Sequence, residues 1–178
     1  MPKFELEIRS FLSDEEYEKL RSRFDSQARL VKEDDQVTMY YSGRADLRLQ
    51  KNNAGGKIWF KSGEMHDEIR EEIEIKISAE DFDKATKLWE ELGYEVEIVW
   101  FRYRRQYEKD GAKITLDDTK GYGKIIELEI LSDAENNAHD LQKLKIMMND
   151  LGVKLTDREE FETKFAYYKE NWRELTKK

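Results

Sequence analysis

The chain has 178 residues, of which 40% are charged and 38% hydrophobic, and its net charge is -8 at pH 7. It contains no cysteine and two histidines, which excludes a disulfide framework, thiolate metal sites, cysteine nucleophiles and a metal site built from histidine. The negative charge disfavours a non-specific nucleic-acid binder. Four Trp, nine Tyr and eight Phe supply large side chains for burial and argue against disorder.

The N-terminus runs directly into charged sequence, and no apolar segment approaches the roughly 18 residues that span a membrane. We therefore expect a cytoplasmic protein with no membrane and no nucleic-acid partner. The length favours one domain over residues 1–178. A homodimer is compatible with the sequence.

The first half of the chain is expected to mix short strands with one helix. Residues 4–9 alternate apolar and charged positions, which predicts a strand, and Ser13 followed by three acidic residues predicts the start of a helix at 14–25. Asn52 to Gly56 has the composition of a hairpin turn. The further strands are expected at 30–31, 37–41, 47–50, 58–61 and 69–77.

The second half repeats this order loosely. Ser78 predicts the cap of a helix at 79–92 that Gly93 ends, and Asp133 predicts the cap of a helix that reaches Leu151. A last helix is expected at 158–175. Strands are expected at 94–100, 101–108, 113–117 and 124–131, with a turn at Asp110-Gly111. Hairpin-connected strands of this kind imply antiparallel pairing and the α+β class.

Three Glu-x-Glu pairs lie on the predicted strands, and the alternation places the two carboxylates of each pair on one face, roughly 7 Å apart. Arginine and lysine occupy matching positions on other strands. Two interpretations remain open. The face is either solvated and laced with salt bridges worth a few tenths of a kcal/mol each, or it lines a closed barrel that holds an oxygen-ligated Mg²⁺ or Mn²⁺ and a polyanion.

Glu5-Leu6-Glu7-Ile8-Arg9 resembles the N-terminal E-x-E-x-K signature of the CYTH, or triphosphate tunnel metalloenzyme, superfamily. That superfamily includes class IV adenylyl cyclases, thiamine triphosphatases and inorganic triphosphatases. Further matching elements follow in family order: Leu47-Arg48-Leu49-Gln50, Lys61, Arg70-x-Glu72-x-Glu74, Arg102-x-Arg104-x-x-Tyr107, Leu116-Asp117 and Gly121-x-Gly123-x-x-x-Glu127-x-Glu129.

The resemblance implies an eight-stranded antiparallel β-barrel with a charged lumen, built from strands at about 3–131 and surrounded by helices, the C-terminal ones at about 133–176. It implies a metal site for Mg²⁺ or Mn²⁺ in which the first and last strands face each other across the lumen, with the ligands Glu5, Glu7, Asp117, Glu127 and Glu129. It implies triphosphate binding by Arg9, Arg48, Lys61, Arg70, Arg102, Arg104 and Lys113. Catalytic positions are expected at Glu72, Glu74, Lys76 and Arg9.

The resemblance therefore implies a metal-dependent enzyme that hydrolyses an inorganic, thiamine or nucleoside triphosphate. Two alternatives stay open: an adenylyl cyclase that makes cyclic AMP from ATP, and a non-catalytic module that binds a triphosphate or polyphosphate. Three positions depart from the family pattern. Arg9 replaces a usual Lys, Gln50 replaces a common second Arg, and Thr38 stands where many members have Asp.

Overall fold

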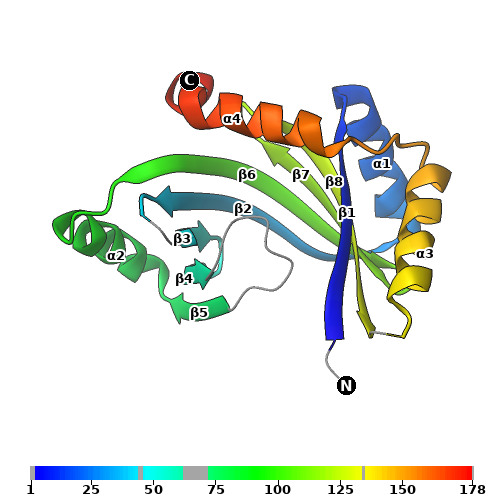
Figure 1. Cartoon of the computed structure of the whole chain (residues 1–178), viewed down its shortest axis with the longest axis horizontal. Helices are drawn as coiled ribbons and strands as arrows, with labels where there is room; N and C mark the ends of the chain where they lie inside the picture. The colour runs from blue at the N-terminus through cyan, green and yellow to red at the C-terminus, as the bar shows by residue number, and fades with distance from the viewer. Residues whose placement is uncertain (1–2, 44–45, 62–71, 134, 178) are drawn as a thin grey trace. The chain divides into compact units, whose positions relative to one another are not determined.

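The computed structural model describes residues 3–43, 46–61, 72–133 and 135–177 (Figure 1). None of the described helices is both long and apolar enough to cross a membrane. The elements follow the order β1 (Lys3–Leu12), α1 (Asp14–Gln27), β2 (Arg29–Tyr41), β3 (Asp46–Asn52), β4 (Gly55–Lys61), β5 (Glu72–Ile77), α2 (Ala79–Glu91), β6 (Val96–Lys109), β7 (Ala112–Thr119), β8 (Gly123–Asp133), α3 (Asn137–Asp150) and α4 (Arg158–Leu175).

The strands form one eight-stranded sheet in the order β1-β8-β7-β6-β2-β3-β4-β5, which confirms the predicted antiparallel α+β fold. The first strand lies beside the last, so that Lys3 pairs with Asp133 and Leu12 with Lys124 (Figure 1). Among the described strands the order is linear, with β1 and β5 at its two ends. A pairing of β1 with β5, which would close the sheet into a barrel, is not part of this order.

In two places, two strands that were predicted separately form one long strand. Residues 30–41 all belong to β2, because Asp34 and Gln36 are polar yet buried, which hides the alternation that a strand usually shows. Residues 96–109 likewise form one strand, β6. Helix α3 begins later than predicted, since Asp133 accepts hydrogen bonds from Asn136 and so stabilises a turn before the helix.

The predicted helix starts and the predicted turn are otherwise confirmed. The Ser13 side chain accepts a hydrogen bond from the Glu16 N–H, and the Glu16 carboxylate accepts one from the Ser13 N–H at 2.8 Å, which closes a capping box. Ser78 caps α2 by accepting from the Asp81 N–H. At the β6–β7 turn Asp110 has a φ of 53° and Gly111 a φ of 77°, the left-handed conformations that a tight hairpin requires.

The chain forms two compact units. The first unit contains Met1–Glu33 and Tyr103–Tyr167, and the second contains Asp34–Arg102 and Tyr168–Lys178. Each unit has its own buried cluster and its own polar sheet face, and each is described separately below. A single domain over 1–178 stays a prediction.

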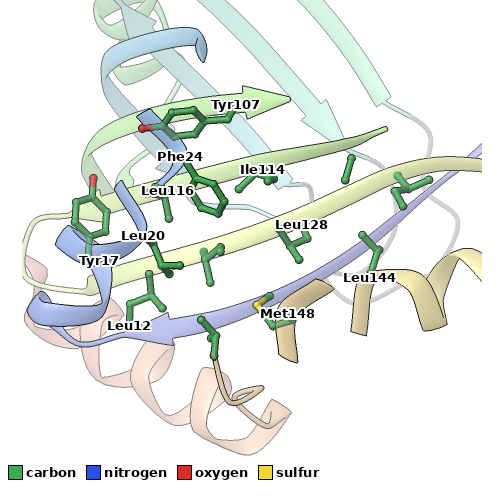
Figure 2. Packing of buried hydrophobic residues seen from close by; sticks show 14 residues of the cluster. Leu12, Tyr17, Leu20, Phe24, Tyr107, Ile114, Leu116, Leu128, Leu144 and Met148 are labelled. Atoms are coloured by element: carbon green, nitrogen blue, oxygen red, sulfur yellow. The ribbon is translucent and has the colours of Figure 1, made fainter. Parts of the chain in front are cut away.

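In the first unit, helices α1 and α3 pack on the apolar face of β7 and β8 (Figure 2). Four side chains of these strands are at most 1% exposed: Ile114, Leu116, Ile126 and Leu128. Burying a side chain of this size contributes about 1.5–3 kcal/mol. Because side chains alternate along a strand, this core places residues 113, 115, 117, 127 and 129 on the opposite, polar face.

In the second unit, α2 packs Phe82 and Trp89 against Tyr41 and Leu49. The C-terminal part of α4 packs on β6, where the ring of Tyr168 stacks on Trp100 and its hydroxyl donates to the Val99 carbonyl at 2.8 Å. These contacts hold β3 and β4 with their charged positions on the face away from α2.

Candidate active site

The charged face of the first unit, which we name the first-unit polar face, consists of Glu7, Arg9, Arg104, Lys113, Thr115, Asp117, Glu127 and Glu129. The strands β1, β8 and β7 lie side by side, and the pairing sets Glu7 opposite Glu129 and Arg9 opposite Glu127. The glutamates of the first and last strands are therefore cross-strand neighbours. The expectation that they face each other across a lumen is wrong, because β1 and β8 are directly hydrogen-bonded.

Glu7 and Glu127 form the most unusual pair on this face. They lie on the neighbouring strands β1 and β8. Burial among protein atoms, followed by the negative charge of Glu127, raises the pKa of Glu7 to about 7. Glu7 is nevertheless exposed, so the pair lies on a surface that water reaches.

A fixed cation lies close to these glutamates. The guanidinium of Arg104 donates to both carboxylate oxygens of buried Asp117, at 2.7 and 2.6 Å. Burial lowers the pKa of Arg104, but the hydrogen bonds and charge of Asp117, with further help from Glu127 and Glu7, raise it above the ordinary value. Arg104 thus stays charged and held in one orientation.

Glu129 is 9% exposed and forms an ion pair with Lys113. The carboxylates of Asp117 and Glu129 are thus each balanced by a cation of the protein, whereas Glu127 raises the pKa of Glu7 through its negative charge. In the described ranges no three acidic or histidine side chains are arranged to hold one metal ion. The side chain of Glu5 lies outside the described part, and the predicted five-ligand metal site stays a prediction.

The Glu7–Glu127 pair nevertheless fits a hard divalent cation. Mg²⁺ in phosphate-processing sites is often held by one or two carboxylates together with substrate phosphates and water. The two side chains offer carboxylate oxygens on neighbouring strands, and a cation would offset the negative charge of Glu127 that raises the pKa of Glu7. The donor set on the first-unit polar face therefore suits Mg²⁺ or Mn²⁺.

The second unit also has a charged face, which we name the second-unit polar face; it consists of Thr38, Tyr40, Asp46, Arg48, Gln50, Lys57, Trp59, Glu74 and Lys76. Arg48 donates to both oxygens of Asp46, at 2.7 and 2.6 Å. Its guanidinium lies 4.4 Å from the ring centre of Tyr40 and 5.7 Å from that of Trp59. A carboxylate and two aromatic rings thus orient this arginine.

Lys57 is a cation of this face that the sequence analysis missed. Its ammonium lies 3.2 Å from the ring centre of Trp59 and 3.0 Å from a Glu74 oxygen. Lys57 also lies opposite Lys76 in the β4–β5 pairing. The signal was present, because Lys57 precedes Trp59 by two residues, but the predicted turn ended at Gly56 and the predicted strand began at Ile58, so Lys57 was assigned to neither.

The two neutral departures from the family pattern contact each other. The amide of Gln50 donates to the hydroxyl of Thr38 at 3.0 Å, and the two residues are 8% and 2% exposed. An Arg and an Asp at these positions would place opposite charges here. In this chain a neutral hydrogen bond replaces that ion pair, so neither change leaves a charge without compensation.

The remaining predicted residues are placed only in part. Arg102 is half-buried on β6 in the second unit, and Glu74 and Lys76 are exposed on β5. The side chains of Lys61 and Glu72, and the whole of Arg70, lie outside the described part of the chain.

Residues 3–160 match the CYTH domain family. The chain belongs to the CYTH family. This confirms the resemblance drawn from the ordered motifs. The CYTH protein is also 29% identical over 111 residues to the "Putative adenylate cyclase MJ0240" of Methanocaldococcus jannaschii, a match that covers 60% of this chain and 62% of that relative. The chain thus spans less than two thirds of that relative's length.

Solved structures share the fold of this CYTH protein. The PH1819 protein of Pyrococcus horikoshii superposes with a TM-score of 0.65 and 27% identity, over 87% of this chain and 94% of that protein. A conserved hypothetical protein from Pyrococcus furiosus superposes with a TM-score of 0.67 and 22% identity, over 84% of this chain and 91% of that protein. The "Putative adenylyl cyclase HpAC1" from Hippeastrum, described as revealing a dominant triphosphatase activity, superposes with a TM-score of 0.64 and 16% identity, over 93% of this chain and 96% of that protein.

Proposed function

We propose that this CYTH protein is a triphosphatase that requires Mg²⁺ or Mn²⁺. The observation that carries the proposal is the Glu7–Glu127 carboxylate pair, held beside the fixed charge of Arg104. Two carboxylates on neighbouring strands, one of them with a raised pKa, lie next to cations and form a place where a hard cation and an anionic phosphate chain can bind together.

Phosphoryl transfer depends on positioning and on stabilising charge on the phosphoryl oxygens. When bound, Mg²⁺ or Mn²⁺ supplies Lewis acidity toward those oxygens and activates water. Glu7 and Glu127 would hold the cation. Arg104, already oriented by Asp117, would neutralise phosphate charge without having to reorganise.

Arg9 has a different role in this proposal. In the described part of the chain Arg104 and Lys113 are paired with carboxylates, whereas Arg9 makes no ion pair and contacts the ring of Phe161. Because a guanidinium keeps its proton at neutral pH, Arg9 binds phosphate and transfers no proton. On the second unit, Arg48 and Arg102, with Lys61 and Arg70, remain proposed phosphate ligands, and Glu72, Glu74 and Lys76 remain proposed catalytic positions.

A cyclase is the second candidate, because the M. jannaschii relative is named for adenylate cyclase and HpAC1 is described by both activities. Hydrolysis releases orthophosphate, whereas cyclisation of ATP yields cyclic AMP and pyrophosphate. A non-catalytic binding module is the third, because Arg9 and the neutral Gln50–Thr38 pair alter the usual charged set.

The test is a screen of the purified protein against tripolyphosphate, thiamine triphosphate and ATP, each with Mg²⁺, Mn²⁺ or a chelator. We expect metal-dependent release of orthophosphate. Cyclic AMP from ATP would select the cyclase, and tight binding by calorimetry without turnover would select the binding module. If none of the three compounds is either turned over or bound, the proposal is overturned.

A further inference from the structure

The first turns of α4 lie against one end of the first-unit polar face through a column of cations and rings. The guanidinium of Arg9 lies 4.6 Å from the ring centre of Phe161. That ring stacks on Phe11, with 4.5 Å between centres and 28° between planes. The ammonium of Lys164 lies 3.9 Å from the ring centre of Phe11. Strand β1 and helix α4 therefore contribute alternate members.

The spacing of the rings fixes the order of this column. Two rings whose centres are 4.5 Å apart are in van der Waals contact, and a cation cannot fit between them. Arg9 must therefore lie on the outer face of Phe161, and Lys164 on the outer face of Phe11. Among the described residues, the ring against which the Arg9 guanidinium rests is that of Phe161.

The ring of Phe161 is itself held in place. It is 9% exposed, and the segment before α4 is tied to β1 by side-chain hydrogen bonds. The Ser10 hydroxyl donates to the Lys154 carbonyl at 2.6 Å, and the Phe11 N–H donates to the Thr156 hydroxyl at 3.0 Å. A rigid aromatic surface thus lies under a side chain that is otherwise exposed.

We propose that Phe161 is a positioning residue for Arg9: its ring holds the guanidinium ready to bind phosphate, which rests on the triphosphate site proposed above. A planar guanidinium stacks on an aromatic face, whereas a compact ammonium does so less extensively. The Phe161 ring therefore also accounts for arginine at the position where the family usually has lysine. Without the ring, Arg9 must lose rotamer freedom each time that phosphate binds.

The test compares Phe161→Leu and Phe161→Trp, each in the natural chain and together with Arg9→Ala. The measurements are kcat and KM for tripolyphosphate with Mg²⁺, the melting temperature, and the NMR resonance of the Arg9 Nε–H, which a neighbouring ring shifts. Phe24→Leu is the control, because Phe24 is a buried ring of α1 that does not touch Arg9.

We expect Phe161→Leu to raise KM about threefold to tenfold while kcat stays within about twofold, and to remove the ring shift of the Arg9 resonance. Phe161→Trp should keep both close to the natural values. In the Arg9→Ala background Phe161→Leu should leave KM unchanged, since its effect passes through Arg9. Phe24→Leu should lower the melting temperature without changing KM.

The inference is wrong if Phe161→Leu raises KM equally with and without Arg9, or if KM rises no more than in Phe24→Leu. An inactive natural protein separates the two proposals. If tripolyphosphate still shifts the Arg9 resonance, and Phe161→Leu weakens that binding, the positioning role stands and only the hydrolysis proposal fails. If tripolyphosphate shifts nothing, both fail.

Discussion

The two polar faces have the same sequence pattern and different chemistry. On the first-unit polar face, carboxylates meet cations or each other, as in Asp117 with Arg104 and Glu7 with Glu127. On the second-unit polar face rings of the neighbouring strands orient the cation, as Tyr40 and Trp59 do for Arg48, whereas the ring under Arg9 on the first-unit polar face comes from helix α4. Alternation along a strand thus determines which side chains share a face. The side chains of the neighbouring strands determine whether that face suits a metal ion or orients cations.

The largest expected effect comes from Glu127→Gln on the first-unit polar face. Losing one of the two carboxylates that we propose as ligands of the cation should remove several kcal/mol of transition-state stabilisation, which corresponds to about a thousandfold loss of metal-dependent turnover. In metal-free buffer the same variant should melt at the same or a higher temperature, because like-charge repulsion with Glu7 is relieved. Assays of phosphate release and thermal melts measure both, with Glu135→Gln as an exposed control.

If Glu127→Gln leaves the affinity for Mn²⁺ unchanged and lowers the melting temperature, the face is a network of salt bridges without a metal site.

The next effect compares the two arginine–aspartate pairs. Asp117→Asn leaves the charge of Arg104 partly buried without its partner and should lower the free energy of unfolding by about 3 kcal/mol. Asp46→Asn should lower it by about half as much, since Arg48 keeps its contacts with Tyr40 and Trp59. Chemical denaturation of both variants gives the two values. Equal losses would mean that the rings contribute nothing to holding Arg48.

The raised pKa of Glu7 predicts a pH dependence. The pKa of Glu7 is about 7 in the folded chain and near 4.5 in the unfolded chain, so the folded state binds more protons in this interval. The free energy of unfolding contributed by Glu7 is therefore full below about pH 4.5 and is lost as pH rises to 7. Allowing for solvent screening, the loss amounts to about 1 kcal/mol.

Subtracting the pH profile of Glu7→Gln from that of the natural chain isolates this contribution, and Glu74→Gln serves as the matched carboxylate on the second-unit polar face. A flat difference between pH 4 and 8 would show that folding does not raise the pKa of Glu7.

The smallest effect is expected for Lys57. Lys57→Gln removes an ion pair with Glu74 and a contact with Trp59, which together should lower the free energy of unfolding by about 0.5–1 kcal/mol at low ionic strength. Part of the loss should persist at high salt, because the contact with the ring is screened less than the ion pair. Denaturation at two salt concentrations provides the comparison, and a loss that vanishes at high salt would assign it to Glu74 alone.

The sequence predicted helices, strands and the faces of strands better than it predicted which distant residues contact each other. Alternating residues located β1, β7 and β8, and capping residues located α1 and α2, because these signals are local. The pairing of Glu7 with Glu129 could not be predicted, since it depends on which distant strand lies beside β1. The contact between Arg9 and Phe161 was missed for the same reason. Asp34 and Gln36 hid the middle of β2, because a buried polar side chain looks like an exposed one in a hydropathy pattern.

The pairing of β1 with β8 also constrains how the chain folds during its synthesis. Strands β3, β4 and β5 pair with strands that are adjacent in sequence, so these pairs can form during translation. Residue 3 finds its partner only after residue 133 has emerged, and such long-range closure is slow. Until then the N-terminal strand has an unpaired edge, which can pair wrongly. The carboxylates of β1 are therefore among the last side chains to reach their neighbours on β8.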